Sequence, residues 1–342
     1  MLEKILMWYN GLADSLFGAV ILFTVGSLLL IKGGDWFVDS SVGIAKRFHV
    51  PEIVIGATVV SVGTTLPEVM VSLTAAVNGN SAIAYGNAIG SIICNTALIA
   101  ALTVAIRPAP ASRKALVAPV SFFFIAAAVY LVAAYVFGSF SRFLGIVMLL
   151  IFGAYMVITV RVGFKENAEK TCGESTERGK NLIIKDIVLL IVSAGLIAVG
   201  ADMLEMSSVS LATMAHIPTE VIGVTVIALC TSLPELVTAI TALTKGHGAL
   251  SLGNVIGANI FNLVLVTGAT ATISPFVIPE GSKLFGFNTS QILEIPLMIG
   301  AMALLTLPAL IKGKLRRWQG ITLLSVYTVF VTLQVLIALK VI

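Results

Sequence analysis

Charged residues are scarce in this chain, and that shortage excludes most classes of soluble protein. Asp, Glu, Lys and Arg make up 11% of the 342 residues, whereas 58% are hydrophobic. A soluble domain carries about 25% charged residues. Cysteine is scarce as well: Cys94, Cys172 and Cys230 are an odd number without metal-site spacing, so neither a disulfide framework nor a zinc site is expected. The composition predicts an all-α polytopic membrane protein.

Two processing and catalytic signals are also missing. The start of the chain, MLEKILMWYN, is followed by Asp14 and by no clear small-residue cleavage site, so it lacks the layout of a secretory signal peptide. The sequence contains no HExxH motif and no evident nucleophile–base set, which argues against an intramembrane hydrolase. Nothing calls for a nucleic acid, an organic cofactor or an obligate protein partner. The expected surroundings are the lipid bilayer.

Apolar runs of about 20 residues are long enough to cross a bilayer as helices. We place ten such spans, at 15–45, 52–77, 82–106, 115–137, 143–162, 184–214, 219–244, 249–273, 291–311 and 319–340. The first and sixth are longer than a bilayer needs and are expected to tilt or to extend past the lipid. The polar segment 164–182 is interpreted as a cytoplasmic linker. It separates a first five-helix half, 1–163 with a short N-terminal extension, from a second, 183–342.

Lysine and arginine are distributed unequally between the two sides of these spans. One side holds sixteen of them: Lys46, Arg47, Arg107, Arg113, Lys114, Arg161, Lys165, Lys170, Arg178, Lys180, Lys185, Lys245, Lys312, Lys314, Arg316 and Arg317. The other side holds only Lys4, Arg142, Lys283 and Lys340, and Lys32 falls inside the first span. The positive-inside rule places the richer side in the cytoplasm. We therefore expect a multi-pass protein of the cell (inner or plasma) membrane with both termini extracytoplasmic.

A forty-residue pattern occurs twice, at 56–95 and 223–262, with a constant offset of 167 residues. Of the 40 aligned positions, 17 are identical and no gap is needed. Because each half has five spans, an odd number, the second copy enters the membrane from the opposite side. The expected fold is therefore ten transmembrane helices in two inverted-topology repeats of five, an arrangement typical of secondary transporters.

Each copy places one glutamate, Glu68 or Glu235, inside an apolar segment. Such a residue is costly in a membrane and is a functional hypothesis by default. A proline precedes each glutamate, and proline in a helix interior removes a hydrogen bond, so each helix is expected to break or kink there. The neighbouring hydroxyls are hard oxygen donors that suit Na⁺ or Ca²⁺, and they belong to Thr64, Thr65, Thr231 and Ser232.

The second part of each copy carries asparagines and glycines at helical spacing. Ser91 and Asn95 share one helix face with Asn87, and Asn254 and Asn262 recur in the other copy. This face either directs oxygens at a cation or serves interhelical packing; we favour packing for Asn87 and Asn254. The glycine pairs 86/90 and 253/257 predict ridges where helices pack backbone to backbone.

Other polar residues have simpler interpretations. A structural Glu68–Lys32 ion pair is conceivable but would leave Glu235 unpaired. Asp35 and Asp202, each followed one turn later by Asp39 or Glu205, are expected at the membrane interface, with ion entry as the alternative. His49 and His216 precede hydrophobe–Pro turns and are expected to mark span boundaries, with a proton relay as the alternative.

These motifs resemble the α-repeats of the cation/Ca²⁺ antiporter superfamily, specifically the prokaryotic sodium/calcium exchangers. The family motif G-T-S-L-P-E appears as GTTLPE and CTSLPE, and G-N-x-I-G-S-N-I appears as GNAIGSII and GNVIGANI. The resemblance implies that Glu68 and Glu235 are the central ligands. It further implies oxygen ligands from Thr64, Thr65, Thr231 and Ser232, a lining of Ser91, Asn95 and Asn262, and backbone carbonyls from Ser61 and Ala228.

The implied function is not enzymatic: it is secondary antiport of Na⁺ against Ca²⁺ by alternating access, with Na⁺ entry driving Ca²⁺ out. Asn262 stands where K⁺-dependent relatives have aspartate, which favours K⁺ independence. Gly90 and Gly257 stand where the proton-coupled branch has glutamate, which disfavours H⁺/Ca²⁺ exchange. Antiport of Ca²⁺ or another divalent cation coupled to H⁺ remains the alternative, and a channel is a further one.

Overall fold

The computed structural model describes residues 11–48, 50–79, 81–108, 112–168, 180–216, 228–278, 283–284, 287–339 and 341. Nine helices in these ranges are long and apolar enough to cross a membrane: Leu16–Arg47, Glu52–Val77, Ile83–Ile106, Arg113–Phe137, Arg142–Val162, Ile183–Met214, Gly248–Ile273, Ser290–Lys312 and Arg317–Ile337. They confirm nine of the ten predicted spans. Of the seventh, predicted at 219–244, the description covers the shorter apolar helix Leu233–Thr244.

Several spans are built from consecutive α- and π-helical segments. The first half contains α2 (Leu16–Arg47), α3 (Glu52–Ile55), η1 (Gly56–Val60), α4 (Ser61–Val77), α5 (Ser81–Cys94), η2 (Asn95–Ala100), α6 (Ala101–Ile106), α7 (Arg113–Leu131), η3 (Val132–Phe137) and α8 (Arg142–Ala168). The second half contains α9 (Lys180–Met214), α11 (Ala228–Thr231), α12 (Leu233–Thr244), α13 (Gly248–Ile260), η5 (Phe261–Val266), α14 (Thr267–Ile273), η6 (Ser290–Glu294), α15 (Ile295–Lys312) and α16 (Arg317–Ala338). The η segments are π-helical.

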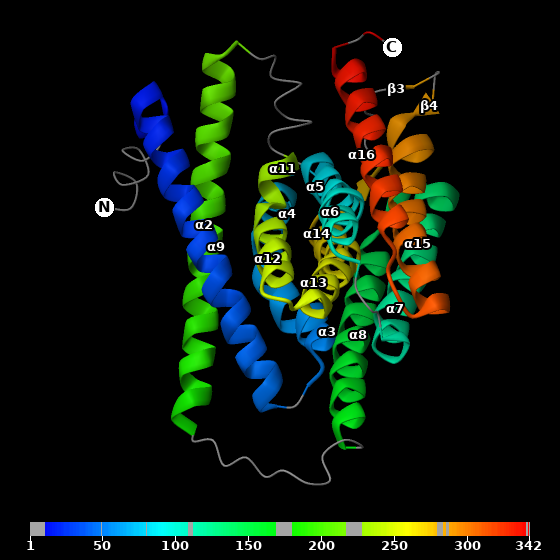
Figure 1. Ribbon diagram of the computed structural model, residues 1–342. Coiled ribbons are helices and arrows are strands. Elements are labelled where there is room, and N and C mark those ends of the chain that lie inside the picture. The colour runs from blue at the N-terminus through cyan, green and yellow to red at the C-terminus, as the bar shows by residue number, and fades with distance from the viewer. Residues whose placement is uncertain are drawn as a thin grey trace.

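The helices form three groups in Figure 1. The long helices α2 and α9 lie side by side at one edge and run in opposite directions; α4, α5, α12 and α13 occupy the centre; α7, α8, α15 and α16 lie on the other side. The opposite directions of α2 and α9 are what an inverted repeat requires of this pair. The complete ten-helix inverted repeat stays a prediction, because part of the seventh span lies outside the described residues.

Close backbone packing joins α2 to α9. A Cβ added at Gly26 would lie 2.9 Å from the carbonyl oxygen of Gly200, and one added at Gly200 would lie 2.8 Å from that of Gly26. Near the end of α2, Arg47 Nε lies 2.5 Å from Asp186 Oδ2 at the start of α9. Small residues at a helix crossing and a charge pair at its end therefore make α2 and α9 a paired unit.

The glycine ridge predicted for the second copy is confirmed. A Cβ at Gly253 would lie 2.2 Å from the carbonyl oxygen of Ile53, and one at Gly257 would lie 2.2 Å from Ser61 Oγ. Helix α13 therefore packs directly on α3 and η1. At Gly86 and Gly90 an added Cβ would meet no atom of the described residues within 4 Å. The segment that the repeat would place there, 220–228, lies largely outside those residues, so the first ridge stays a prediction.

The helix break predicted at each proline occurs in one copy only. Helix α12 begins at Leu233 after Ser232, whose φ of −95° and ψ of 9° separate it from α11, and Pro234 stands in the first turn. Proline is well placed there, because the first N–H groups of a helix have no partner to lose. Helix α4 instead runs without interruption through Pro67. The irregular turn of this span falls earlier, in η1, so the backbone departs from α-geometry without ending the helix.

Within the described ranges, four two-residue strands add to the predicted all-helical fold. β1 (Ser139–Phe140) pairs antiparallel with β2 (Phe276–Val277), and β3 (Lys283–Leu284) pairs with β4 (Phe287–Asn288). Phe140 and Phe276 stack with ring centroids 4.8 Å apart. This contact ties the turn after η3 to the end of α14. His216, with a φ of 57°, follows α9, which fits the predicted span boundary; His49 lies outside the described residues.

Candidate cation site

Two glutamates from different halves of the chain meet at the centre of the bundle. Glu68 on α4 and Glu235 in the first turn of α12 are both 0% exposed. Their carboxyl groups are close enough to interact electrostatically. The ion pairs found among the described residues include neither glutamate, and Lys32 is exposed on α2, so the alternative Glu68–Lys32 pair is absent. The structure thus brings together two buried acids that have no basic partner in the described ranges.

Hydroxyl groups of the first motif reach across to the second half. Thr65 Oγ1 donates to Glu235 Oε1 at 3.3 Å. Thr64 Oγ1 donates to Asn254 Oδ1 at 3.2 Å, and Ser61 Oγ donates to the carbonyl oxygen of Asn254 at 3.0 Å. These bonds connect the two glutamate-bearing regions into one polar centre.

The first-copy asparagine has a comparable packing role. Asn87 Nδ2 donates to the carbonyl oxygen of Glu68 at 3.2 Å and to Ser72 Oγ at 2.9 Å. Both bonds fix α5 against α4. The packing interpretation of Asn87 and Asn254 therefore agrees with their observed partners, although the Nδ2 group of Asn254 finds none among the described residues.

The site is assembled crosswise. Helix α4, which carries Glu68, packs against η5 of the second half, and α12, which carries Glu235, packs against η2 of the first half. Asn95 is the first residue of η2, and Asn262 is the second residue of η5. Each glutamate-bearing helix therefore lies against the asparagine-bearing segment of the opposite half, and neither half could form the site alone.

Both site asparagines lie in π-helical turns, which the sequence motifs did not predict. Such turns are rare and occur frequently at functional sites. In η5 the hydroxyl of Thr267 donates to the carbonyl oxygen of Asn262, five residues earlier, at 3.2 Å. A π-turn shifts the helix register by one residue, so it changes which side chains face the site.

Several buried oxygens of the site have no hydrogen-bond partner among the described residues. They are both carboxylate oxygens of Glu68, Oε2 of Glu235, Oγ of Ser91 and of Ser232, and Oδ1 of Asn95 and of Asn262. Every one belongs to a side chain that is at most 2% exposed. Buried polar groups are nearly always hydrogen-bonded, and leaving one unpaired is costly. Such a cluster is what a bound hard cation would satisfy.

Three other predicted ligands lie close to this centre in the chain. Thr231 is half-buried at the end of α11. Ser61 begins α4 and Ala228 begins α11, and the ligand role of their backbone carbonyls stays a prediction; the Ser61 hydroxyl donates to the carbonyl oxygens of Gly56 and Asn254. Among the described residues, no group of three or more His, Cys, Asp and Glu side chains could hold a metal ion. The site therefore combines two carboxylates with neutral oxygens.

The predicted ligand set leaves out two polar residues near this centre, although one of them, Asn259, belongs to the quoted motif GNVIGANI. Asn259 Nδ2 donates to Thr96 Oγ1 at 2.7 Å, while its Oδ1 lacks a partner among the described residues. Thr238 Oγ1 likewise lacks one there and is fully buried. At an offset of 167 their counterparts are Ile92 and Val71. A comparison that relies on duplication cannot find residues present in one copy only.

Similarity to known proteins agrees with this geometry. The family model described as "Sodium/calcium exchanger protein" matches residues 18–161 and 185–336. The chain belongs to the sodium/calcium exchanger family. The gap between the matched segments falls across the predicted linker 164–182, whose limits stay a prediction.

Relatives and solved structures of this family match nearly the whole chain. The sodium/calcium exchanger MaX1 of Methanosarcina acetivorans is 30% identical over 348 residues, covering 91% of this chain and 96% of the relative. The uncharacterized membrane protein MJ0091 of Methanocaldococcus jannaschii is 34% identical over 310 residues, covering 90% and 95%. A structure of the sodium-calcium exchanger NCX_Mj soaked with 2.5 mM Na⁺ and 10 mM Sr²⁺ aligns with a TM-score of 0.78 and 31% identity, covering 93% of this chain and 99% of that one.

Membership of the family fixes the general class of the protein. It is a helical, multi-pass membrane transporter of the cation/Ca²⁺ exchangers, and its family and fold are not those of an enzyme. The resemblance that the two motifs predicted is thereby confirmed.

Proposed function

We propose that this exchanger carries Na⁺ and Ca²⁺ alternately through one shared site between its two halves. The observation that carries the proposal is the cluster of buried oxygens around Glu68 and Glu235 that have no hydrogen-bond partner in the described part of the chain. Ca²⁺ binds about six to eight hard oxygen ligands. The proposed set comprises the two carboxylates, oxygens of Thr64, Thr65, Thr231, Ser232, Ser91, Asn95 and Asn262, and the backbone carbonyls of Ser61 and Ala228.

The charge of this site explains why transport would be exchange rather than leak. Two ionised carboxylates in a low-dielectric interior repel each other and need water, protons or a cation. One Ca²⁺ neutralises both charges. Two Na⁺ do the same, and the neutral oxygens can accept a further one. The empty site therefore resists closure, and the protein changes its access side only when it is loaded.

The basic residues support a direction for this exchange. The end of α2, the start of α7 and the start of α16 lie at the same end of the bundle (Figure 1), and they carry Lys46 and Arg47, Arg113 and Lys114, and Arg317. We place this end in the cytoplasm, with the linker 164–182 on the same side and both termini extracytoplasmic. In the cell membrane, Na⁺ entry down its gradient would then drive Ca²⁺ out.

The proposal is tested with purified full-length protein reconstituted into vesicles. Vesicles loaded with Na⁺ and diluted into choline medium should take up radioactive Ca²⁺, whereas choline-loaded vesicles should not. A pH gradient imposed without Na⁺ should have no effect. Uptake that follows the pH gradient and ignores Na⁺ would establish the proton-coupled alternative, and a continuous Ca²⁺ conductance without a counter-ion would establish a channel.

A further inference from the structure

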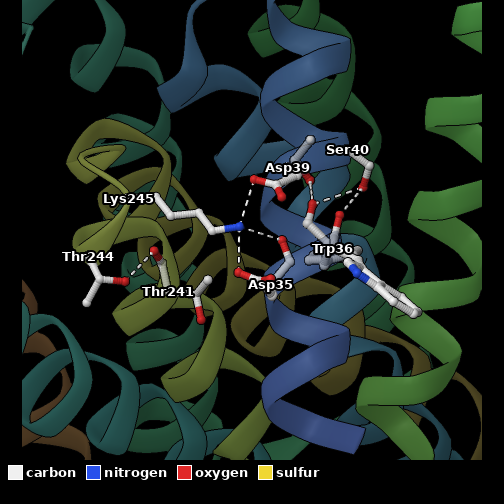
Figure 2. A network of polar contacts seen from close by, with 9 residues as sticks. Asp35, Trp36, Asp39, Ser40, Thr241, Thr244 and Lys245 are labelled. Carbon is white, nitrogen blue, oxygen red and sulfur yellow. Dashed lines mark hydrogen bonds and ion pairs between the residues drawn. The ribbon is translucent and has the colours of Figure 1, made fainter.

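A lysine at the end of α12 bridges two aspartates of α2. Lys245 Nζ lies 2.6 Å from Asp35 Oδ1, 2.7 Å from Asp39 Oδ1 and 3.0 Å from the carbonyl oxygen of Asp35, as Figure 2 shows. A lysine ammonium has three donors, and here each one has an acceptor. The two carboxylates belong to one face of α2, one helical turn apart. One cation thus fixes two acids of another span.

The backbones of the two helices are close beside this network. A Cβ at Gly34 would lie 2.7 Å from Val237 Cγ1 and 3.5 Å from Thr241 Oγ1 on α12. Helix α12 also carries Glu235 in its first turn. Ten residues of helix separate Glu235 from Lys245, or roughly 15 Å at 1.5 Å per residue. The lysine bridge therefore closes α2 onto the helix of the cation site, at the end of the bundle that is rich in basic residues.

Through α2 the bridge also restrains α9. The two helices are joined by their glycine crossing and by the Arg47–Asp186 pair. A small apolar cluster of Leu30, Ala201 and Leu204 connects the pair to α12 through Leu233 and Val237. The main hydrophobic core also takes in residues of α2 and α12, among them Phe37 and Ala239, so the polar bridge acts beside apolar packing between these helices.

The repeat contains this bridge on one side only. At the constant offset of 167 residues, Lys245 corresponds to Asn78 and Asp39 corresponds to Met206, whereas Asp35 corresponds to Asp202. Asn78 occupies the same structural place, directly after α4, as Lys245 does after α12. The ammonium is not repeated, although Glu205, one turn after Asp202, supplies a second carboxylate on α9. The contact between α2 and α12 therefore contains a lysine that the repeat-related positions on α9 and after α4 do not supply.

We propose that Lys245 is a positioning residue that holds α2 against α12. It thereby favours the conformation in which the path between the cation site and the basic end of the bundle is closed. The inference rests on the alternating access proposed above. Partly exposed ion pairs that form a network shift a two-state equilibrium by about two- to tenfold. A bridge of that strength biases the resting state without preventing the change of access that transport requires.

Distances between spin labels test this bridge independently of transport. Labels are attached to cysteines replacing Lys46 on α2 and Lys114 on α7, in full-length protein in lipid nanodiscs free of Na⁺ and Ca²⁺. In Lys245→Met the population with the longer interlabel distance should grow by about two- to tenfold. The matched variant Lys312→Met removes a lysine at the end of α15 and should leave the distribution unchanged.

Two further comparisons separate the bridge from a general loss of charge or folding. Asp35→Asn with Asp39→Asn should reproduce the shift, and adding Lys245→Met to that pair should add nothing, because the three residues form one network. High choline chloride should move the parent protein toward the variants by screening. An unchanged distance distribution in Lys245→Met, at an unaltered melting temperature, overturns the inference. A shift without Na⁺-dependent Ca²⁺ uptake would instead contradict the proposed function alone.

Discussion

Replacing one site glutamate by glutamine is the sharpest perturbation of the proposed site. Glu68→Gln keeps the size of the side chain and one oxygen but removes one of two charges that face the cation. Both glutamates are 0% exposed, so water does not screen the loss. Breaking a buried charge pair costs about 3–5 kcal/mol, which corresponds to an about 10²- to 10⁴-fold weaker affinity for Ca²⁺. Glu235→Gln should have an effect of the same order.

Calorimetric titration of purified protein with Ca²⁺ measures this effect directly. Glu294→Gln is the matched control, since it makes the same chemical change at the end of η6, where the carboxylate accepts from Gln334 Nε2 at 2.9 Å. The control should bind Ca²⁺ as the parent does. Without Ca²⁺, Glu68→Gln should melt no earlier than the parent, because it removes a buried charge that none of the described residues neutralises. Ca²⁺ affinity within threefold of the parent in Glu68→Gln would refute the assignment of this residue.

Three other predictions concern single residues. Asn262→Asp adds a third negative charge to the site, which one Ca²⁺ cannot neutralise. Ca²⁺ uptake into Na⁺-loaded vesicles should therefore come to depend on added K⁺. Equal uptake with and without K⁺ argues against a ligand at this position. Gly257→Ala places a Cβ 2.2 Å from Ser61 Oγ and should destabilise the folded protein by about 1–3 kcal/mol, which would lower its melting temperature. In the control Gly300→Ala the added Cβ meets no described atom within 4 Å, so the melting temperature should not change. Burial lowers the pKa of Lys245, but hydrogen bonds to its two aspartate partners raise it more, so the net shift is upward. The ammonium should therefore stay protonated up to at least the ordinary lysine range, and the interlabel distance should stay constant between about pH 6 and pH 9. A longer interlabel distance within that pH range would contradict the assignment.

The spans and the central acids could be predicted because their signals are local and strong. An apolar run of about 20 residues identifies a span by length alone, and nine runs became helices of the expected kind. Glu68 and Glu235 were found because a buried acid is costly and because the acid is duplicated. Their meeting at the centre follows from two halves packed crosswise.

The differences between the two copies could not be predicted in the same way. Pro67 and Pro234 stand in similar local sequences, GTTLPE and CTSLPE, yet α4 continues through the first proline and α12 begins one residue before the second. Whether a helix ends at a proline depends on the packing of the turns before it. The bridge of Lys245 to Asp35 joins positions 210 residues apart, which the sequence placed separately at a loop and at the membrane interface. Contacts of this kind follow from the tertiary fold.

Competition between the two ions tests the central claim, that one site built by both halves serves Na⁺ and Ca²⁺. Calorimetric Ca²⁺ titrations are repeated at rising NaCl, with choline chloride keeping the ionic strength constant. Because two carboxylates need at least two Na⁺ for neutrality, the apparent Kd for Ca²⁺ should rise with at least about the second power of the Na⁺ concentration. In Glu68→Gln this dependence should become shallower. A Kd for Ca²⁺ that stays constant across the NaCl series would show that the ions bind at separate sites and would contradict the shared site.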